Sequence, residues 1–126
     1  MSVAASVFVG LAALLHVYIF WMESLAWTRP EVWKRFSVAD QATADVTRPM
    51  AYNQGFYNLF LAIGAALGLG LWWTGHETAG RTLALFATGS MVAAAAVLLT
   101  SGRHYLRAAL TQGTLPLIGF VLFALL

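Results

Sequence analysis

The sequence predicts an all-α, four-helix transmembrane bundle, and two observations carry that prediction. Of the 126 residues, 60% are hydrophobic and only 10% are charged, and the mean hydropathy is +0.75. Soluble domains usually carry about 25% charged residues, so this chain has too little polar surface to coat a soluble globule. The apolar residues also gather in long runs, each close to the roughly 20 residues that cross a bilayer as a helix.

The expected spans of a single membrane domain are about residues 3–27, 51–73, 80–101 and 105–126. The last apolar run, Gly113 to Leu126, is short, so its helix must begin near Tyr105 to reach across a bilayer. Pro116 lies inside this run, which a membrane helix tolerates where its neighbours satisfy the freed carbonyl.

Basic residues indicate the orientation of the bundle. Only Arg81 falls on the side that holds both termini and the turn between the second and third spans. The side with the other two connections holds Arg29, Lys34, Arg35, Arg48, Arg103 and Arg107. Cytoplasmic loops of membrane proteins carry such an excess. We therefore expect a multi-pass protein of a bacterial cytoplasmic (inner) membrane, with those two loops inside and both termini outside.

The first connection is the only long one. Its TRPE, Thr28 to Glu31, has the spacing of a capping box with a proline in the first turn. Trp33 and Phe36 follow three residues apart, beside Lys34 and Arg35. We expect a short helix on the cytoplasmic interface, with its aromatic rings toward the membrane and its basic groups toward lipid phosphates. A mobile loop with two incidental aromatic residues is the alternative.

Polar side chains gather in the expected cytoplasmic half of every span. His16 precedes Glu23 by seven residues, nearly two helical turns, so the two are expected to share a face. The other half offers glycine, alanine, leucine and phenylalanine, and its only ionisable group is Arg81 at the boundary. Glycines such as Gly68 allow close helix approach there. This asymmetry predicts a tightly packed outer half closing a polar pocket that faces the cytoplasm.

His16 and Glu23 are the candidate catalytic residues, with the neutral imidazole as a base and the carboxylate orienting it or returning its proton. The candidate ligand-binding residues are Tyr18, Trp27, Asn53, Gln54, Tyr57, Asn58 and Gln112. Each polar group also has a structural alternative. A buried histidine can donate to one carbonyl, a carboxylate at a helix end can reach water, and amides can bridge helices.

The sequence predicts no metal site and defines no cofactor. It contains no cysteine and no His-Glu-x-x-His motif, and Glu23 is the only carboxylate available inside the bundle. A di-metal carboxylate centre needs several. Nucleic acid is not an expected partner, because the basic residues follow the membrane topology.

The expected function is binding of a small lipophilic molecule, such as a quinone, an isoprenoid or a lipid, and acid–base chemistry on it stays open. Membrane lipids are the other expected partners, and the glycine-rich faces of so thin a bundle favour a homo-oligomer. A small proton-coupled transporter is one alternative, although Glu23 lies near the membrane boundary and the outer half continues no proton path. An accessory or assembly subunit, whose pocket receives a partner helix, is the other.

Three stretches resemble one known family. ALLHVYIFWMESLAW, Ala13 to Trp27, resembles the His-x-Tyr-Ile…Glu…Trp signature of the small bacterial family called domain of unknown function thirteen-oh-four. NQGFYNLFLAIG, Asn53 to Gly64, resembles its second-helix motif, and TQGTLP, Thr111 to Pro116, its Gln-Gly-x-x-Pro entry to the last helix. The resemblance implies a four-helix membrane protein and no established activity. It highlights His16, Tyr18, Glu23, Trp27, Asn53, Gln54, Gly55, Asn58, Gln112 and Gly113.

Overall fold

The computed structural model describes residues 1–126 and contains helices and turns but no strand. The main helices are α1 (Ser2–Phe20), α3 (Gln41–Trp73), α4 (Glu77–Thr100) and α5 (Leu106–Ala124). A π-helical turn, η1 (Trp21–Leu25), continues α1. The connections contain α2 (Pro30–Trp33) and two 3-10 turns, η2 (Lys34–Phe36) and η3 (Arg103–Tyr105).

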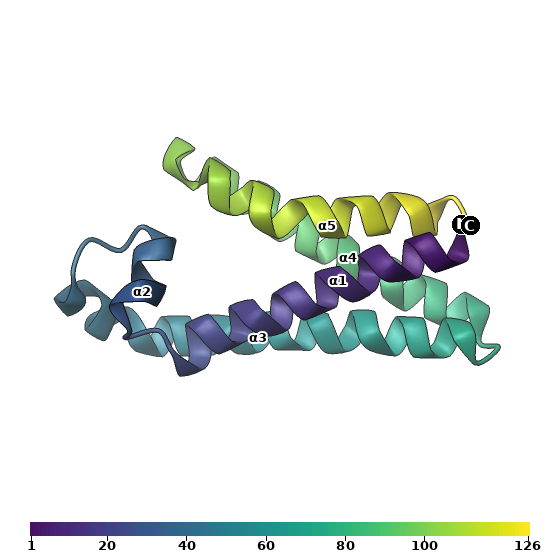
Figure 1. Cartoon of the computed structure of the whole chain (residues 1–126), viewed down its shortest axis with the longest axis horizontal. Helices are drawn as coiled ribbons and strands as arrows, with labels where there is room; N and C mark the ends of the chain where they lie inside the picture. The colour runs from purple at the N-terminus through teal and green to yellow at the C-terminus, as the bar shows by residue number, and fades with distance from the viewer.

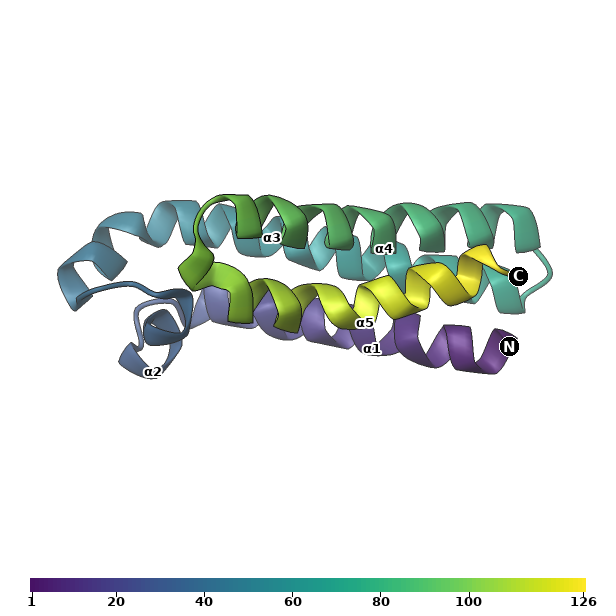
Figure 2. The same cartoon turned by 90° about the horizontal axis from the view of Figure 1, so that it is seen from above.

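The four main helices form a closed ring. Helices α1 and α4 each pack against both α3 and α5, and α1 meets α4 only slightly across the diagonal. Both termini lie at one end of the bundle, beside the α3–α4 turn (Figures 1 and 2). The opposite end, here called the loop end, carries α2, η2 and the α4–α5 connection (Figure 1). The predicted all-α four-helix bundle is therefore confirmed.

Four segments are long and apolar enough to cross a membrane. They are Ser2–Leu25, Gln41–Trp73, Glu77–Thr100 and Arg103–Ala124. The outward faces of these helices remain apolar: Leu14 is 68% exposed and Phe86 is 71% exposed. Such a surface suits hydrocarbon rather than water. The chain therefore has the make-up of a multi-pass membrane protein.

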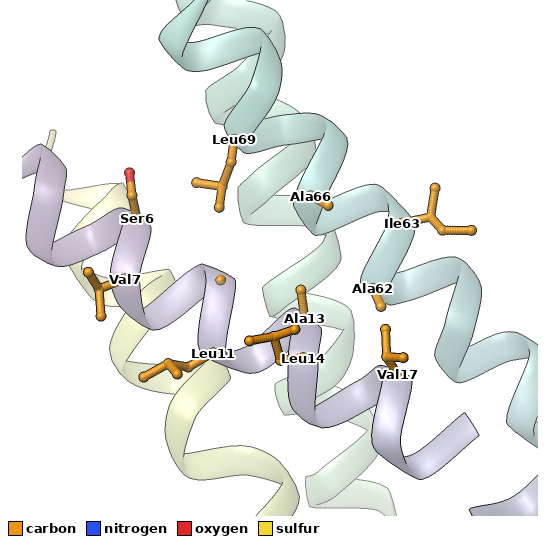
Figure 3. A pocket seen from close by; sticks show the side chains of 11 residues that line it. Ser6, Val7, Leu11, Ala13, Leu14, Val17, Ala62, Ile63, Ala66 and Leu69 are labelled. Carbon is orange, nitrogen blue, oxygen red and sulfur yellow. The ribbon is translucent and has the colours of Figure 1, made fainter. Parts of the chain in front are cut away.

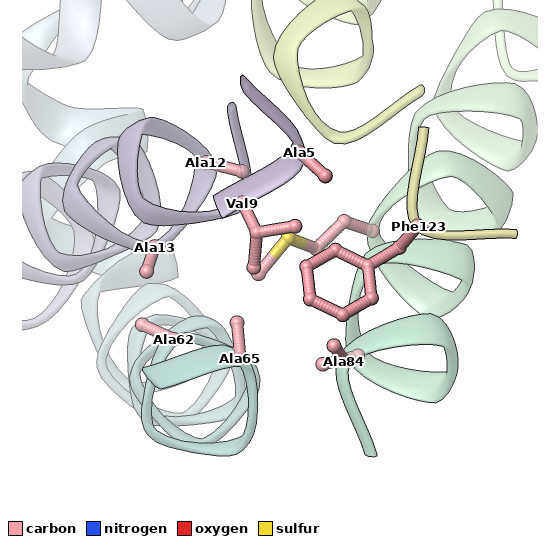
Figure 4. Close-up of a cluster of buried hydrophobic side chains, with 10 residues drawn as sticks. Ala5, Val9, Ala12, Ala13, Ala62, Ala65, Ala84 and Phe123 are labelled. Carbon is pink, nitrogen blue, oxygen red and sulfur yellow. The ribbon is translucent and has the colours of Figure 1, made fainter. Parts of the chain in front are cut away.

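Small residues form most of the core in the half that holds the termini. Alanines from α1, α3 and α4 form one cluster with Val9, Met91 and Phe123, and Figure 4 shows alanines from the three helices around the Phe123 ring. A Cβ added at Gly68 would lie 2.7 Å from the backbone nitrogen of Ala84, and one added at Gly80 would overlap the backbone of Trp72. Both glycines therefore let α3 and α4 approach closely, as the sequence predicted for Gly68.

The long first connection is tied to the start of α3. The Trp33 indole nitrogen donates to Gln41 Oε1 at 3.0 Å, and Gln41 Nε2 donates to the Thr28 carbonyl at 2.9 Å. The predicted short helix is present as α2, with Pro30 in its first turn. The predicted capping box is wrong, because Arg29 is the N-cap and no side chain caps this helix.

The aromatic residues of this connection pack inward. Trp33 is buried, and the Phe36 ring lies 5.1 Å from the ring of Trp27. The expectation that the ring faces the membrane is therefore wrong for Trp33, while Phe36 is partly buried against the apolar residues at the end of the first span. Helix α3 also begins at Gln41, earlier than the expected span, since Asp40 caps it by accepting from the Thr43 backbone nitrogen at 2.8 Å.

Candidate functional site

Glu23 lies in a π-helical turn at the loop end of α1. In this turn the backbone nitrogen of Ala26 donates to the Trp21 carbonyl at 3.0 Å, five residues back rather than four. One residue is thereby added to the turn, so the face predicted from ideal helical spacing does not continue through it. Single π turns inside α-helices occur frequently at functional sites, and here the turn carries the only buried carboxylate.

Glu23 pairs with Asn58 across the α1–α3 interface. The Asn58 side-chain nitrogen donates to Glu23 Oε1 at 2.6 Å, and only 6% of Glu23 is exposed. The same nitrogen also approaches its own helix, 3.3 Å from the Gln54 carbonyl. A carboxylate inside a membrane-spanning segment is costly and is most often functional. The Glu23–Asn58 pair is thus the first part of the candidate site.

Gly55 explains how the two helices come close enough for this pair. The Ser24 hydroxyl donates to the Tyr52 carbonyl at 2.7 Å, directly beside Gly55. A Cβ at position 55 would overlap the Ser24 hydroxyl. The Phe20 ring completes this contact, with its centroid 5.1 Å from that of Phe56. In the motif NQGFYN, glycine therefore serves close packing, and the last asparagine meets the carboxylate.

The other predicted ligand-binding residues of the motif lie elsewhere. Asn53, Gln54 and Tyr57 are exposed on the outside of α3. The structure does not bring them together with Glu23 into one cavity. Their role in binding a ligand stays a prediction.

His16 is buried and contacts its own helix. Its Nδ1 lies 2.9 Å from the Ala12 carbonyl, and only 2% of the residue is exposed. A carbonyl oxygen can only accept, so Nδ1 is the protonated nitrogen in this contact. This geometry matches the structural alternative for His16, since the imidazole makes no hydrogen bond to Glu23. A catalytic role for the two residues stays a prediction.

Trp27 anchors the first connection. Its indole nitrogen donates to the Ala44 carbonyl at 3.0 Å, and the side chain is buried. Tyr18 is instead 43% exposed, and its ring stacks on Trp21 with centroids 5.9 Å apart. Of these two predicted ligand-binding residues, only Tyr18 has surface available to a ligand.

Tyr18 and Gln112 line a cleft at the loop end, between α1, η2 and the start of α5. The cleft has a volume of about 630 Å³. Its wall on α1 and η1 is Leu15, Tyr18, Ile19 and Met22, and its wall on α5 is Arg107, Ala108, Thr111 and Gln112. The remaining lining residues are Lys34, Arg35, Phe36, Ser37 and His104. We call this space the loop-end cleft.

Sequence reasoning found two residues of this cleft and missed most of the others. One signal was present: Leu15, Ile19 and Met22 recur at the spacing of one helical stripe. The η2 residues could not be found in this way, because the fold of the connection brings them to α5. Ser37 ends η2 with φ of 60°, a left-handed conformation that is uncommon for residues other than glycine.

A second hollow is apolar and lies in the other half of the bundle. It has a volume of about 530 Å³ and runs between α1 and α3 (Figure 3). Leu11 and Leu14 border it on α1, and Ile63 and Leu69 border it on α3. None of the predicted site residues lines it. No group of three or more His, Cys, Asp or Glu side chains is placed to hold a metal ion.

Residues 10–124 match the model of a family described as "Protein of unknown function (DUF1304)". The match covers most of the chain, so the chain belongs to this family, and the resemblance predicted from its motifs is confirmed. No curated protein and no solved structure matches the chain.

Proposed function

With the family as the premise, we propose that this membrane protein binds a small lipophilic molecule in the loop-end cleft. The observation that carries the proposal is the two-sided lining of the cleft. Leu15, Ile19 and Met22 offer an apolar wall, and Thr111 and Gln112 offer hydrogen-bonding groups opposite it. Ligand sites in proteins combine these two features in the same way.

The size of the cleft supports this proposal. Its volume of about 630 Å³ falls within the usual range for small-molecule sites, roughly 300–1,000 Å³. Tyr18 adds a ring with a polar hydroxyl at one edge. The proposal places the loop end at the cytoplasmic face of a bacterial inner membrane, because the basic residues gather there.

Binding, rather than catalysis or transport, is the function that the geometry supports best. His16 and Glu23 do not line the cleft, and the Glu23 carboxylate contacts α3 instead. A ligand in the cleft therefore has no buried acid or base beside it. A proton-coupled transporter would need a path from Glu23 toward the termini, and the core there has no ionisable side chain: its hydrophobic residues surround one buried polar residue, Thr88, whose hydroxyl donates to the Ala84 carbonyl.

Native mass spectrometry of the purified protein tests the proposal. A small molecule should co-purify with the wild type and be recovered by lipid extraction. Ala108→Trp fills the cleft and should remove that molecule. Leu110→Trp is the matched control, because it adds the same ring on the exposed side of α5, where Leu110 is 59% exposed. Equal ligand content in the two variants would contradict the proposal.

A further inference from the structure

The loop-end cleft has a one-sided charge. Lys34 and Arg35 from η2 and Arg107 from α5 all line it, with His104 beside them. No aspartate or glutamate is among the lining residues. The basic residues of η2 and Arg107 of α5 are far apart in the sequence, so the fold brings them to one cleft.

Like charges that share one space repel one another, and a bound anion removes this repulsion. Guanidinium groups also present paired donors that match the geometry of carboxylate and phosphate oxygens. The Gln112 side-chain amide supplies a further donor on the same wall, whereas the Thr111 hydroxyl already donates to the Arg107 carbonyl at 2.8 Å. The polar side of the cleft is therefore suited to an anion.

The opposite wall restricts the ligand further. Leu15, Ile19 and Met22 would leave a free inorganic anion against hydrocarbon, where it loses hydration without gaining partners. An apolar chain attached to the anion would cover these side chains and gain from their burial. Basic pockets between membrane helices on the cytoplasmic side bind lipid head groups in this way.

Resting on the proposed function, we infer that the ligand is an anionic amphiphile. Its phosphate or carboxylate head lies among Lys34, Arg35 and Arg107, and its apolar chain lies along α1. Ser37 helps to set this arrangement, since its left-handed conformation ends η2 at the edge of the cleft. The head-group contacts give selectivity, and the chain gives affinity.

The test measures binding to the full-length protein in a neutral maltoside detergent, by native mass spectrometry. The probes are dodecyl phosphate, dodecanol and inorganic phosphate, which separate the head from the chain. Dodecyl phosphate should bind at least about tenfold more tightly than either of the others. Dodecanol lacks the charge-assisted contact to Arg107, and inorganic phosphate lacks the apolar chain that covers the wall of the cleft.

Charge-removing variants give the second readout. Arg107→Gln should weaken dodecyl phosphate binding about tenfold, and Lys34→Gln with Arg35→Gln should weaken it further. Arg103→Gln removes an equal charge at the same end from a residue that does not line the cleft. It should change binding by no more than about twofold, because Arg103 does not line the cleft and salt screens a charge that makes no direct contact with the head group. Thermal unfolding of each variant checks that it is folded.

Three results would overturn the inference. Equal weakening by Arg103→Gln and Arg107→Gln would show general attraction to a basic surface. Dodecanol binding as tightly as dodecyl phosphate would show that the ligand needs no anionic head group, although the binding function itself would stand. Inorganic phosphate binding as tightly as dodecyl phosphate would show that the ligand needs no apolar chain. If no probe binds and no molecule co-purifies with the wild type, the proposed function itself fails.

Discussion

At the loop end, the two sides of α1 meet their neighbours in different ways. Toward α3 the contact is closed: Ser24 fits against Gly55, and Glu23 accepts a hydrogen bond from Asn58. Toward α5 the contact is open, and the loop-end cleft of about 630 Å³ lies between the helices. The π-helical turn packs on α3, which fixes the closed side and leaves the other side free.

The difference shows how one helix can hold a polar residue and a binding space at once. On the closed side, each buried polar group has a partner, and no buried side-chain nitrogen or oxygen lacks one. On the open side, polar groups such as Gln112 face a space that a ligand can enter. Polar residues at a similar depth in the bundle therefore serve different purposes, and substitutions on each side should have different effects.

Gly55→Val should break the closed side and have the largest effect. The added side chain would overlap Ser24, so the helices must separate, at a cost of about 3 kcal/mol or more in the free energy of unfolding. Thermal unfolding in detergent measures this. Gly70→Ala is the control, because nothing lies near that position, and it should leave the protein as stable or more so. Equal stability of the two variants would mean that the closed contact is absent.

Glu23→Ala should have the next largest effect, because it removes the acceptor for Asn58. Losing this buried hydrogen bond costs about 1–2 kcal/mol, because the Asn58 nitrogen keeps only its longer contact with the Gln54 carbonyl. Glu23→Gln keeps a side-chain oxygen for the same hydrogen bond, so its loss of stability should be smaller. Denaturation of both variants alongside Asn58→Ala measures the coupling. If the loss of stability in the Glu23→Ala, Asn58→Ala double variant equals the sum of the two single losses, the pair contributes nothing to the free energy of unfolding.

Ser37→Gly should act on the open side and raise stability by about 1 kcal/mol, since glycine adopts the left-handed conformation without strain. A greater melting temperature with unchanged ligand content would support Ser37 as a turn residue only. Lost ligand content in the more stable variant would show that its side chain contacts the ligand.

The smallest effect is expected at the first turn of α3. Hydrogen bonds from Thr43 lower the pKa of the Asp40 carboxyl. A lowered folded-state pKa means that the cap stabilises the helix above the ordinary pKa of aspartate, about 3.9, and is lost as the pH falls through the folded value. The protection of the Thr43 and Ala44 amides, measured as the exchange rate relative to the intrinsic rate at each pH, should therefore fall on acidification. In Asp40→Asn, which caps without titrating, it should stay level.

The sequence was informative where long apolar runs decide the structure. The four main helices follow from such runs, and the Glu23–Asn58 contact joins two residues that were assigned to one site. The extended start of α3 was missed because residues 41–50 are too polar to be recognised as part of a membrane span. The Asp40 cap was the signal that could have revealed it.

Tertiary packing explains what the sequence could not reveal. No residue pattern marks the π-helical turn, so the expected shared face of His16 and Glu23 assumed ideal spacing. Lys34 and Arg35 were assigned to lipid phosphates at the interface, which stays a prediction, but the sequence did not reveal that they share a cleft with the start of α5. Such a placement depends on how Trp33 and Gln41 fix the connection, and this involves contacts between separate segments.

Cysteine labelling tests most directly the contrast between the open and closed sides. The chain has no cysteine, so single cysteines report cleanly. Thr111→Cys lines the loop-end cleft and should react with a water-soluble maleimide, and dodecyl phosphate should protect it. Ala51→Cys, on the buried side of α3, should stay unreactive. Equal reactivity at the two positions, or no protection at position 111, would contradict the account.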